Sequence, residues 1–187
     1  SRAQWPRRDR SPAWQPTAAR RSYRRETRSR VEPPEEASLE KLYRMANHRS
    51  EEQLAEMRRL ADAGVCLFCP GQLASNADNP ILHLTEWWSV TRNRYPYPNA
   101  RLHLLFVPAV HVSDLTDLPI AAQADFWDVL AWAKQRFALD FYGLGARCGD
   151  CAFTGGTIQH VHLHLLVGDV DNPAHEPVRM KFSSRQD

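Results

Sequence analysis

The chain contains 187 residues, of which 43% are hydrophobic and 25% charged, so it can form one domain of moderate size with a hydrophobic core. It has no apolar run near the roughly 18 to 20 residues of a membrane span and no apolar segment of a secretory signal, which argues against a membrane partner and favours a cytoplasmic location. The net charge of +2 conceals an asymmetry, because residues 1–30 carry ten arginines and two acidic residues while the remaining residues are net −6.

Residues 1–37 form a basic tail that is rich in Arg, Pro and Ser and shows no hydrophobic periodicity. This composition cannot offset the conformational entropy lost on ordering, so we do not expect the tail to fold by itself. It can serve as an arm for nucleic acid or an acidic partner, with Trp5, Trp14 and Tyr23 available to stack on bases. A solvated extension without such a role and, with less support, an organelle-targeting sequence are the alternatives.

Residues 38–64 are predicted to form a helical extension. Apolar side chains recur at helical spacing in its first part, at Leu39, Leu42, Tyr43 and Ala46. Ser50 then has the character of a helix N-cap, with Gln53 at the capping-box position. Gly64 is suited to end that second helix.

The middle of the chain combines short apolar runs with one long helical pattern. We expect strands around residues 87–90, at Leu102–Pro108 and at Leu144–Arg147, with a helix from Pro119 to Leu139 between the last two. The prediction is therefore an α+β fold in which one long helix crosses between strands.

Two C-x-x-C pairs lie far apart in the sequence, Cys66 with Cys69 and Cys148 with Cys151. This spacing allows two thiolates to reach one tetrahedral ion, and two such pairs could together form a four-thiolate zinc site. Redox pairs, disulfides and buried thiols are the alternatives, although nothing in the sequence marks a secreted protein.

Three histidines, His160, His162 and His164, alternate with apolar residues after the glycine pair Gly155 and Gly156. Alternate residues of a strand share a face, so we expect the three imidazoles to project from one side. The row is consistent with a metal site or with nucleophilic catalysis, and less so with a solvated strand face. The outer two histidines would be roughly 13 Å apart on an extended strand, too far to bind one ion together.

Four motifs resemble those of the histidine triad (HIT) superfamily of nucleotide hydrolases and transferases: CLFC, FVPAVHVSDLTDL, GGTIQH and HVHLHLL. They lie in one order along residues 65–170, which we expect to form a HIT-like domain with an antiparallel sheet and a long crossing helix. Residues 171–187 would then be a C-terminal extension. The resemblance implies nucleotide binding and a homodimer, with the helix Pro119–Leu139 packed across the interface.

The resemblance also implies a reaction at the α-phosphorus of a nucleotide conjugate, such as a dinucleoside polyphosphate or a nucleoside phosphoramidate. His162 would attack and form a covalent nucleotidyl-histidine intermediate, and His164 would stabilise charge on a phosphate oxygen. His160 would orient the nucleophile or bind a metal, and Thr157 would lie near the leaving group. A neutral imidazole suits this role because its ordinary pKa is about 6.5.

In the zinc-containing branch of the family, the implied ligands are Cys66, Cys69, His111 and His160. A closed set of two thiolates and two imidazoles would make the zinc structural and would leave His162 as the nucleophile. The four-cysteine site described above would instead leave His111 and His160 free.

For the nucleotide itself, the resemblance places substrate-binding residues at Asn93, Gly155, Gly156 and Trp88, although a buried tryptophan in the core is an equally good interpretation of Trp88. For His103 and Arg147, a structural position and a position near the phosphates are both consistent with the sequence. Gly149, with Asp150 beside it, stands where many members have a phosphate-binding Asn. The alternative to an enzyme is a binding or assembly protein that uses residues 1–37 on nucleic acid.

Overall fold

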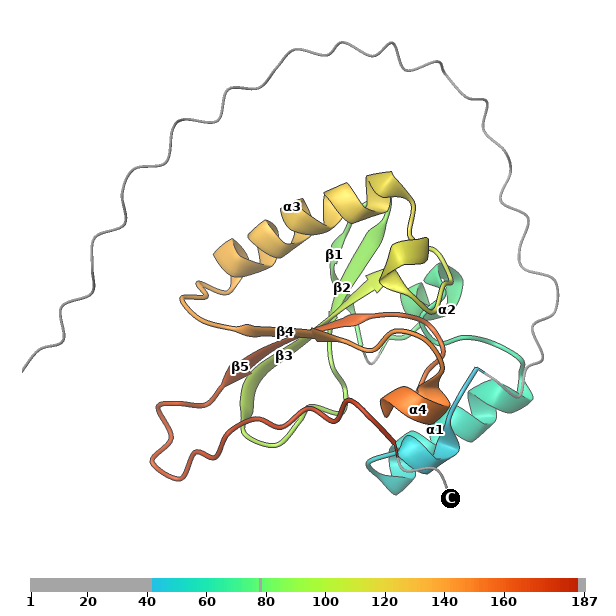
Figure 1. Cartoon of the computed structure of the whole chain (residues 1–187), viewed down its shortest axis with the longest axis horizontal. Helices are drawn as coiled ribbons and strands as arrows, with labels where there is room; N and C mark the ends of the chain where they lie inside the picture. Colours follow the sequence, from blue (N-terminus) through green and yellow to red (C-terminus); the bar gives the residue numbers. More distant parts are fainter. Residues whose placement is uncertain (1–41, 78, 185–187) are drawn as a thin grey trace, which may run out of the picture. The chain divides into compact units, whose positions relative to one another are not determined.

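The computed structural model describes residues 42–77 and 79–184, so the predicted basic tail lies outside the described residues. The described part has an α+β fold, as expected, with a five-stranded antiparallel sheet in the order β1-β2-β3-β5-β4 (Figure 1). The strands are β1 (Ile81–Leu84), β2 (Trp88–Arg92), β3 (Ala100–Pro108), β4 (Gly143–Ala146) and β5 (Leu163–Gly168).

The central strand β3 supplies both faces of the sheet with apolar side chains. Leu104 and Phe106 pack in one cluster with helix α3 (Ile120–Arg136), whereas Leu105 and Val107 pack in a second cluster with helix α1 (Glu51–Asp62). This alternation follows from the two-residue period of a strand. The long helix thus covers one face, and the other face is left for α1 and the histidines.

The N-terminal part of the described chain agrees with its predicted cap but not with its first predicted helix. The Ser50 hydroxyl accepts a hydrogen bond from the Gln53 N–H at 3.2 Å, and Gly64 follows the end of α1 with a φ of +67°. The Gln53 side chain reaches back to the Arg49 N–H at 2.8 Å, one residue before the position of a standard capping box.

The expected helix over residues 38–46 is wrong for its described part, because residues 42–44 are extended and a single 3-10 turn, η2 (Met45–Asn47), follows. Tyr43 forms a β-bridge with Ile158, and the Arg44 N–H donates to the Thr157 carbonyl at 3.0 Å. The backbone of this segment is therefore bonded to the residues just before the histidine row. Tertiary pairing overrides the local helical pattern.

Several short elements were not predicted. They are α2 (Pro70–Ala74), β1, the 3-10 turn η3 (Leu115–Asp117) and α4 (Cys151–Thr154). The helix α3 begins at Ile120, with Pro119 as its N-cap instead of its first helical residue, and ends at Arg136. Within the described residues, no helix combines the length and the apolar character needed to cross a membrane.

Candidate active site and metal centre

The histidine row starts before the strand that it was expected to occupy. β5 begins at Leu163, so only His164 belongs to the regular strand, while His160 lies in a bend. The expectation of three imidazoles on one strand is wrong for His160 and His162, which both precede β5. All three side chains are buried, and the bend gives His160 different neighbours from His162 and His164.

The His162 ring has one nitrogen fixed and the other directed to a cavity. Its Nδ1 lies 2.8 Å from the His160 carbonyl oxygen, which can only accept, so Nδ1 carries the proton and Nε2 of the neutral ring has a free lone pair. Burial lowers the pKa of His162 to about 4, which keeps the ring neutral near pH 7. The Phe68 ring packs against His162 with centroids 4.7 Å apart.

His164 on β5 lies between two polar neighbours, His103 on β3 and Arg147 just after β4. Its Nδ1 lies 2.8 Å from His103 Nε2 on β3, and its Nε2 lies 3.1 Å from Nη1 of Arg147. The Tyr97 N–H donates to His103 Nδ1 at 3.2 Å. With this N–H fixed, a neutral His103 carries its proton on Nε2 and donates to His164 Nδ1, whereas Arg147, which can only donate, opposes a proton on His164 Nε2.

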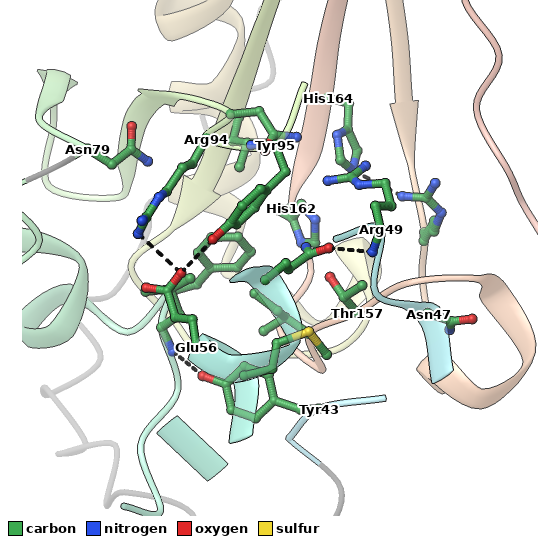
Figure 2. A pocket seen from close by; sticks show the side chains of 18 of the residues that line it. Tyr43, Asn47, Arg49, Glu56, Asn79, Arg94, Tyr95, Thr157, His162 and His164 are labelled. Atoms are coloured by element: carbon green, nitrogen blue, oxygen red, sulfur yellow. Dashed lines mark hydrogen bonds and ion pairs between the residues drawn. The ribbon is translucent and has the colours of Figure 1, made fainter. Parts of the chain in front are cut away.

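The cavity beside His162 is lined on one wall by mostly apolar side chains, from Tyr43, Met57, Leu60, Leu67, Phe68, Leu105 and Ile158. Figure 2 shows Glu56, Arg94 and Tyr95 on one side of His162 and Asn47 and Arg49 on the other. Its polar ends and apolar wall give the cavity the character of a site for an amphipathic small molecule.

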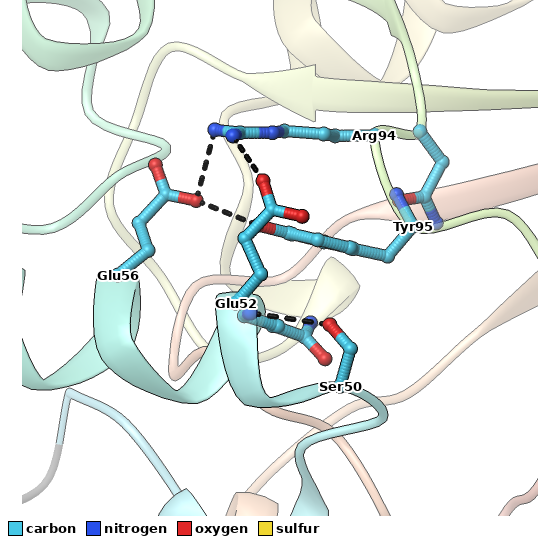
Figure 3. Close-up of polar contacts among 7 residues, drawn as sticks. Ser50, Glu52, Glu56, Arg94 and Tyr95 are labelled. Atoms are coloured by element: carbon cyan, nitrogen blue, oxygen red, sulfur yellow. Dashed lines mark hydrogen bonds and ion pairs between the residues drawn. The ribbon is translucent and has the colours of Figure 1, made fainter.

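The first polar end is held by ion pairs. Arg94 contacts the carboxylates of Glu52 and Glu56 on α1, and the Tyr95 hydroxyl donates to Glu56 at 3.1 Å (Figure 3). These contacts connect α1 to the loop after β2, which also contains Asn93. The amide of Asn93 is engaged through its Oδ1, which accepts from the Tyr95 N–H at 3.0 Å.

A second group of side chains converges on the other side of the histidine row. The candidate ligand atoms of Cys66, Cys69, His111 and His160 all lie within 4.8 Å of one another. His160 Nδ1 is 3.5 Å from Cys66 Sγ, and His111 Nδ1 is 3.4 Å from Cys69 Sγ. Hydrogen bonds from Cys66 and then from His111 and His160 lower the pKa of the Cys69 thiol.

The donors in this group fit a zinc ion. His160 Nε2 lies 3.0 Å from the Pro108 carbonyl, so it carries the proton and leaves Nδ1 free toward the thiols. A backbone carbonyl in this position is the usual outer partner of a metal-binding histidine. Two thiolates and two imidazoles are a common structural zinc set.

The remaining residues that were predicted to contact the substrate are divided between the cavity and the hydrophobic core. Thr157 and Gly155 line the cavity, and the Gly156 carbonyl beside them accepts from Asn47 Nδ2 at 2.7 Å. Trp88 is instead buried in the core against α3, where its Nε1–H donates to the Ala122 carbonyl at 2.7 Å. It does not line the cavity.

The second cysteine pair is not part of the ligand group. All four cysteines are free thiols, and burial raises the pKa of Cys151 to about 11. Asp150 follows Gly149, the position where many family members have a phosphate-binding Asn. It is exposed and caps α4, because its side chain accepts a hydrogen bond from the Ala152 N–H at 2.7 Å. Its carboxylate is therefore occupied at a helix end.

Sequence reasoning did not single out Arg49, Glu56 or Tyr97 as site residues. Arg49 and Glu56 lie more than a hundred residues before the histidine row, in a segment whose pattern indicated only helix packing. Tyr97 looked like part of a proline-rich turn. No local signal in the sequence distinguishes these residues from ordinary surface and core positions.

Comparison with known proteins finds one family model and several solved structures that are similar to parts of this chain. Residues 89–171 match the family model of the HIT domain, whereas no curated protein matches the chain. A HIT family hydrolase from Clostridium thermocellum is 23% identical and aligns over 51% of this chain and 84% of its own, with a TM-score of 0.42. A zinc-bound histidine triad family protein from Mycobacterium smegmatis is 24% identical over 60% of this chain and 82% of its own, with a TM-score of 0.41.

A hypothetical histidine triad nucleotide-binding protein from Sulfolobus tokodaii is 18% identical and aligns over 65% of this chain and 82% of its own, with a TM-score of 0.46. The family-model match covers β2 to β5, and with them His103, Arg147 and the complete histidine row. The chain therefore carries a HIT domain at residues 89–171.

Proposed function

We propose that the protein is a nucleotide hydrolase or nucleotidyltransferase that acts at the α-phosphorus of a nucleotide conjugate. The observation that carries the proposal is the His162 ring, whose Nδ1–H is held by the His160 carbonyl while Nε2 is free beside the cavity. A buried, neutral and oriented imidazole is a suitable nucleophile at neutral pH.

In the proposed first step, the Nε2 lone pair of His162 attacks the α-phosphorus and the bond from phosphorus to the leaving group breaks. The leaving group departs with that electron pair, and a nucleotidyl group remains on Nε2. The imidazolium that forms keeps its Nδ1–H bond to the His160 carbonyl. Water or another acceptor then attacks the phosphorus, releases a proton and returns the P–N electron pair to His162.

Two neighbours support this chemistry. In the tautomer that His103 favours, His164 is proposed to donate from Nε2–H to a non-bridging phosphate oxygen, which would also take over the Arg147 Nη1 contact and where negative charge increases in the transition state. Thr157 lies beside His162 in the cavity and is proposed to donate to the leaving group. Gly155, which lines the cavity, and the adjacent Gly156 are proposed to bring backbone close to the phosphate.

The nucleoside is proposed to lie toward Glu56, Arg94 and Tyr95, against the apolar wall. Asn93 is proposed to accept a ribose hydroxyl through the second lone pair of its Oδ1, because the first takes the Tyr95 N–H. Trp88 has no part in this proposal.

Zinc is proposed as a structural ion held by Cys66, Cys69, His111 and His160. When bound, it would supply a cross-link between the loop at residues 66–69 and the catalytic segment. Phe68 lies between the two cysteines in sequence and packs on His162, so this cross-link would also position the nucleophile.

Residues 65–170 are proposed as the catalytic domain, with the segments before and after them completing the cavity. A homodimer is proposed through α3, on which Ile120 and Trp127 are 78% and 66% exposed. A binding protein that acts through residues 1–37 is the second candidate, but such a protein has no need for the fixed tautomer of His162.

Intact-protein mass spectrometry with a non-acidic quench tests the proposal, after mixing with diadenosine tetraphosphate or adenosine phosphoramidate. We expect an added mass of one nucleotidyl group on the wild type and none on His162→Ala. Turnover by the wild type with no adduct, or an adduct that persists in His162→Ala, would contradict the assignment of the nucleophile.

A further inference from the structure

The second polar end of the cavity is lined by three cationic side chains, Arg49, Arg147 and Lys181. In Figure 2, Arg49 and His164 lie on the side of His162 opposite to Glu56 and Arg94. If the nucleoside lies toward Glu56, as proposed above, these cations face the part of the substrate beyond the α-phosphorus. They therefore meet the leaving group.

The cations at this end have no carboxylate partners. Within residues 42–77 and 79–184, none of the three forms an ion pair, whereas Arg94 at the other end is paired with both Glu52 and Glu56. The guanidinium carbons of Arg49 and Arg147 lie 4.7 Å and 6.0 Å from the centre of the Tyr97 ring, so one aromatic ring gathers two positive charges. Desolvation and the nearby Arg147 both lower the pKa of Arg49.

The Arg147 guanidinium is fixed at this end of the cavity by neutral partners. Its Nη2 donates to the Tyr97 hydroxyl at 2.6 Å, and its Nη1 lies 3.1 Å from His164 Nε2. A fixed guanidinium that has only neutral partners keeps its full charge for an anion, to which it can donate charge-assisted hydrogen bonds. The arrangement is therefore that of an anion site.

Two of the three cations come from outside residues 89–171, which match the HIT domain. Arg49 precedes α1, and Lys181 belongs to the C-terminal extension. The backbone carbonyl of Lys181 accepts a hydrogen bond from Arg147 Nε at 2.6 Å. The two flanking segments meet where the Ser184 hydroxyl bonds to Asn47 Oδ1 at 3.0 Å, and Asn47 Nδ2 bonds to the Gly156 carbonyl. The leaving-group end is thus built by segments that are fixed to the loop before His160.

We infer that Arg49, Arg147 and Lys181 bind phosphates beyond the α-phosphate, so that the preferred substrates are nucleoside polyphosphate conjugates with an anionic leaving group. A phosphoramidate with a neutral amine leaving group would leave these three charges unused. The inference rests on the proposed function, because it depends on where that reaction places the α-phosphorus.

Calorimetric binding of AMP, ADP and ATP to full-length His162→Ala, which cannot react, measures the contribution of each phosphate. We expect binding to tighten by about tenfold for each added phosphate, because each adds charge-assisted hydrogen bonds. Arg49→Gln and Arg147→Gln, each in the same background, should reduce this gain by about tenfold. Arg58→Gln is the matched control, since Arg58 is exposed on α1 and does not line the cavity.

Equal affinity for AMP and ATP would overturn the inference, as would a ratio that Arg49→Gln and Arg147→Gln leave unchanged. Wild-type kinetics then separate its failure from that of the proposed function. If diadenosine tetraphosphate and adenosine phosphoramidate react and Arg49→Gln slows both equally, the anionic preference is wrong while the chemistry stands. If neither gives turnover or an adduct, the proposed function itself fails, whatever the binding ratios.

Discussion

His160 and His162 are two residues apart, but their surroundings prepare them for different chemistry. His160 has Nε2 bound to the Pro108 carbonyl and Nδ1 directed to Cys66, among the candidate zinc ligands. His162 has Nδ1 bound to the His160 carbonyl and Nε2 beside the nucleotide cavity. In each ring a backbone carbonyl fixes the proton on one nitrogen and frees the other.

The comparison shows that the partner of one ring nitrogen determines the chemistry available at the other. Both residues are buried histidines in one short motif, so residue type and burial do not separate them. The bend before β5 separates them, because it turns His160 away from the face that carries His164. Substitutions on each side test this division between a metal side and a catalytic side.

The largest effect on stability is expected on the metal side. Cys66→Ser removes a buried thiolate ligand, so the variant should lose its zinc and about 3 kcal/mol of unfolding free energy, or ~10 °C in Tm. Zinc analysis together with thermal unfolding measures both. Cys148→Ser is the control, since Cys148 lies outside the ligand group and should change neither; a Cys66→Ser variant with full zinc content would contradict the ligand assignment.

On the catalytic side, His103 is expected to act as a positioning residue through His164. His103→Leu removes the donor that fixes the His164 tautomer, so kcat should fall by about 100-fold with a smaller change in KM. His103→Gln keeps an N–H donor of similar reach and should recover about tenfold of that loss. Equal activity of the two variants in steady-state assays would show that the donor is not used.

The burial of His103 should also make the free energy of unfolding depend on pH. Burial lowers the pKa of His103 to about 3, below its ordinary value of 6.5, so the unfolded chain binds a proton that the folded chain does not. The stability that the neutral form supplies is complete above about pH 6.5 and is lost as pH falls toward 3.

Urea unfolding at pH 7.5 and pH 5.0 measures this loss. His103→Leu should lose about 2 kcal/mol less than the wild type between these two pH values, because it lacks the histidine that protonates on unfolding. The difference between the two proteins isolates His103 from the zinc ligands, which titrate in both. Identical losses would contradict a depressed pKa for His103.

The smallest effect is expected at the ion pairs between α1 and Arg94. The Glu52 side chain is 64% exposed, so Glu52→Gln should change the unfolding free energy by less than about 0.5 kcal/mol. Glu56→Gln should weaken nucleotide binding more than it changes stability, since Glu56 lines the cavity and also holds the Tyr95 hydroxyl. Urea unfolding and nucleotide titration of both variants check this; a stability loss well above ~0.5 kcal/mol for Glu52→Gln, or unchanged nucleotide binding by Glu56→Gln, would contradict it.

The features that sequence analysis predicted well are those with a local signal. The apolar run of β3, the long helix α3 and the cap at Ser50 depend on neighbouring residues, so pattern and capping rules find them. The four candidate zinc ligands were found through the family resemblance and converge in the structure. The short edge strand β1 and the five-residue α2 carry too few residues for a periodic signal.

The features that were missed depend on contacts between distant residues. Residues 42–44 are extended because their backbone bonds to residues near Thr157, more than a hundred positions away. The Tyr97, His103, His164 and Arg147 contacts join three segments, and the cationic end of the cavity requires both flanking extensions. Such pairings arise only when the chain is folded.

Native mass spectrometry of His160→Cys and His162→Ala tests the division between the two histidines most directly, because one spectrum reports both bound zinc and the nucleotidyl adduct. We predict that His162→Ala holds one zinc and forms no adduct with diadenosine tetraphosphate. His160→Cys, which replaces one zinc-binding side chain by another, should hold zinc and still form the adduct. Loss of zinc from His162→Ala, or an adduct that maps to His160 in the wild type, would contradict the account.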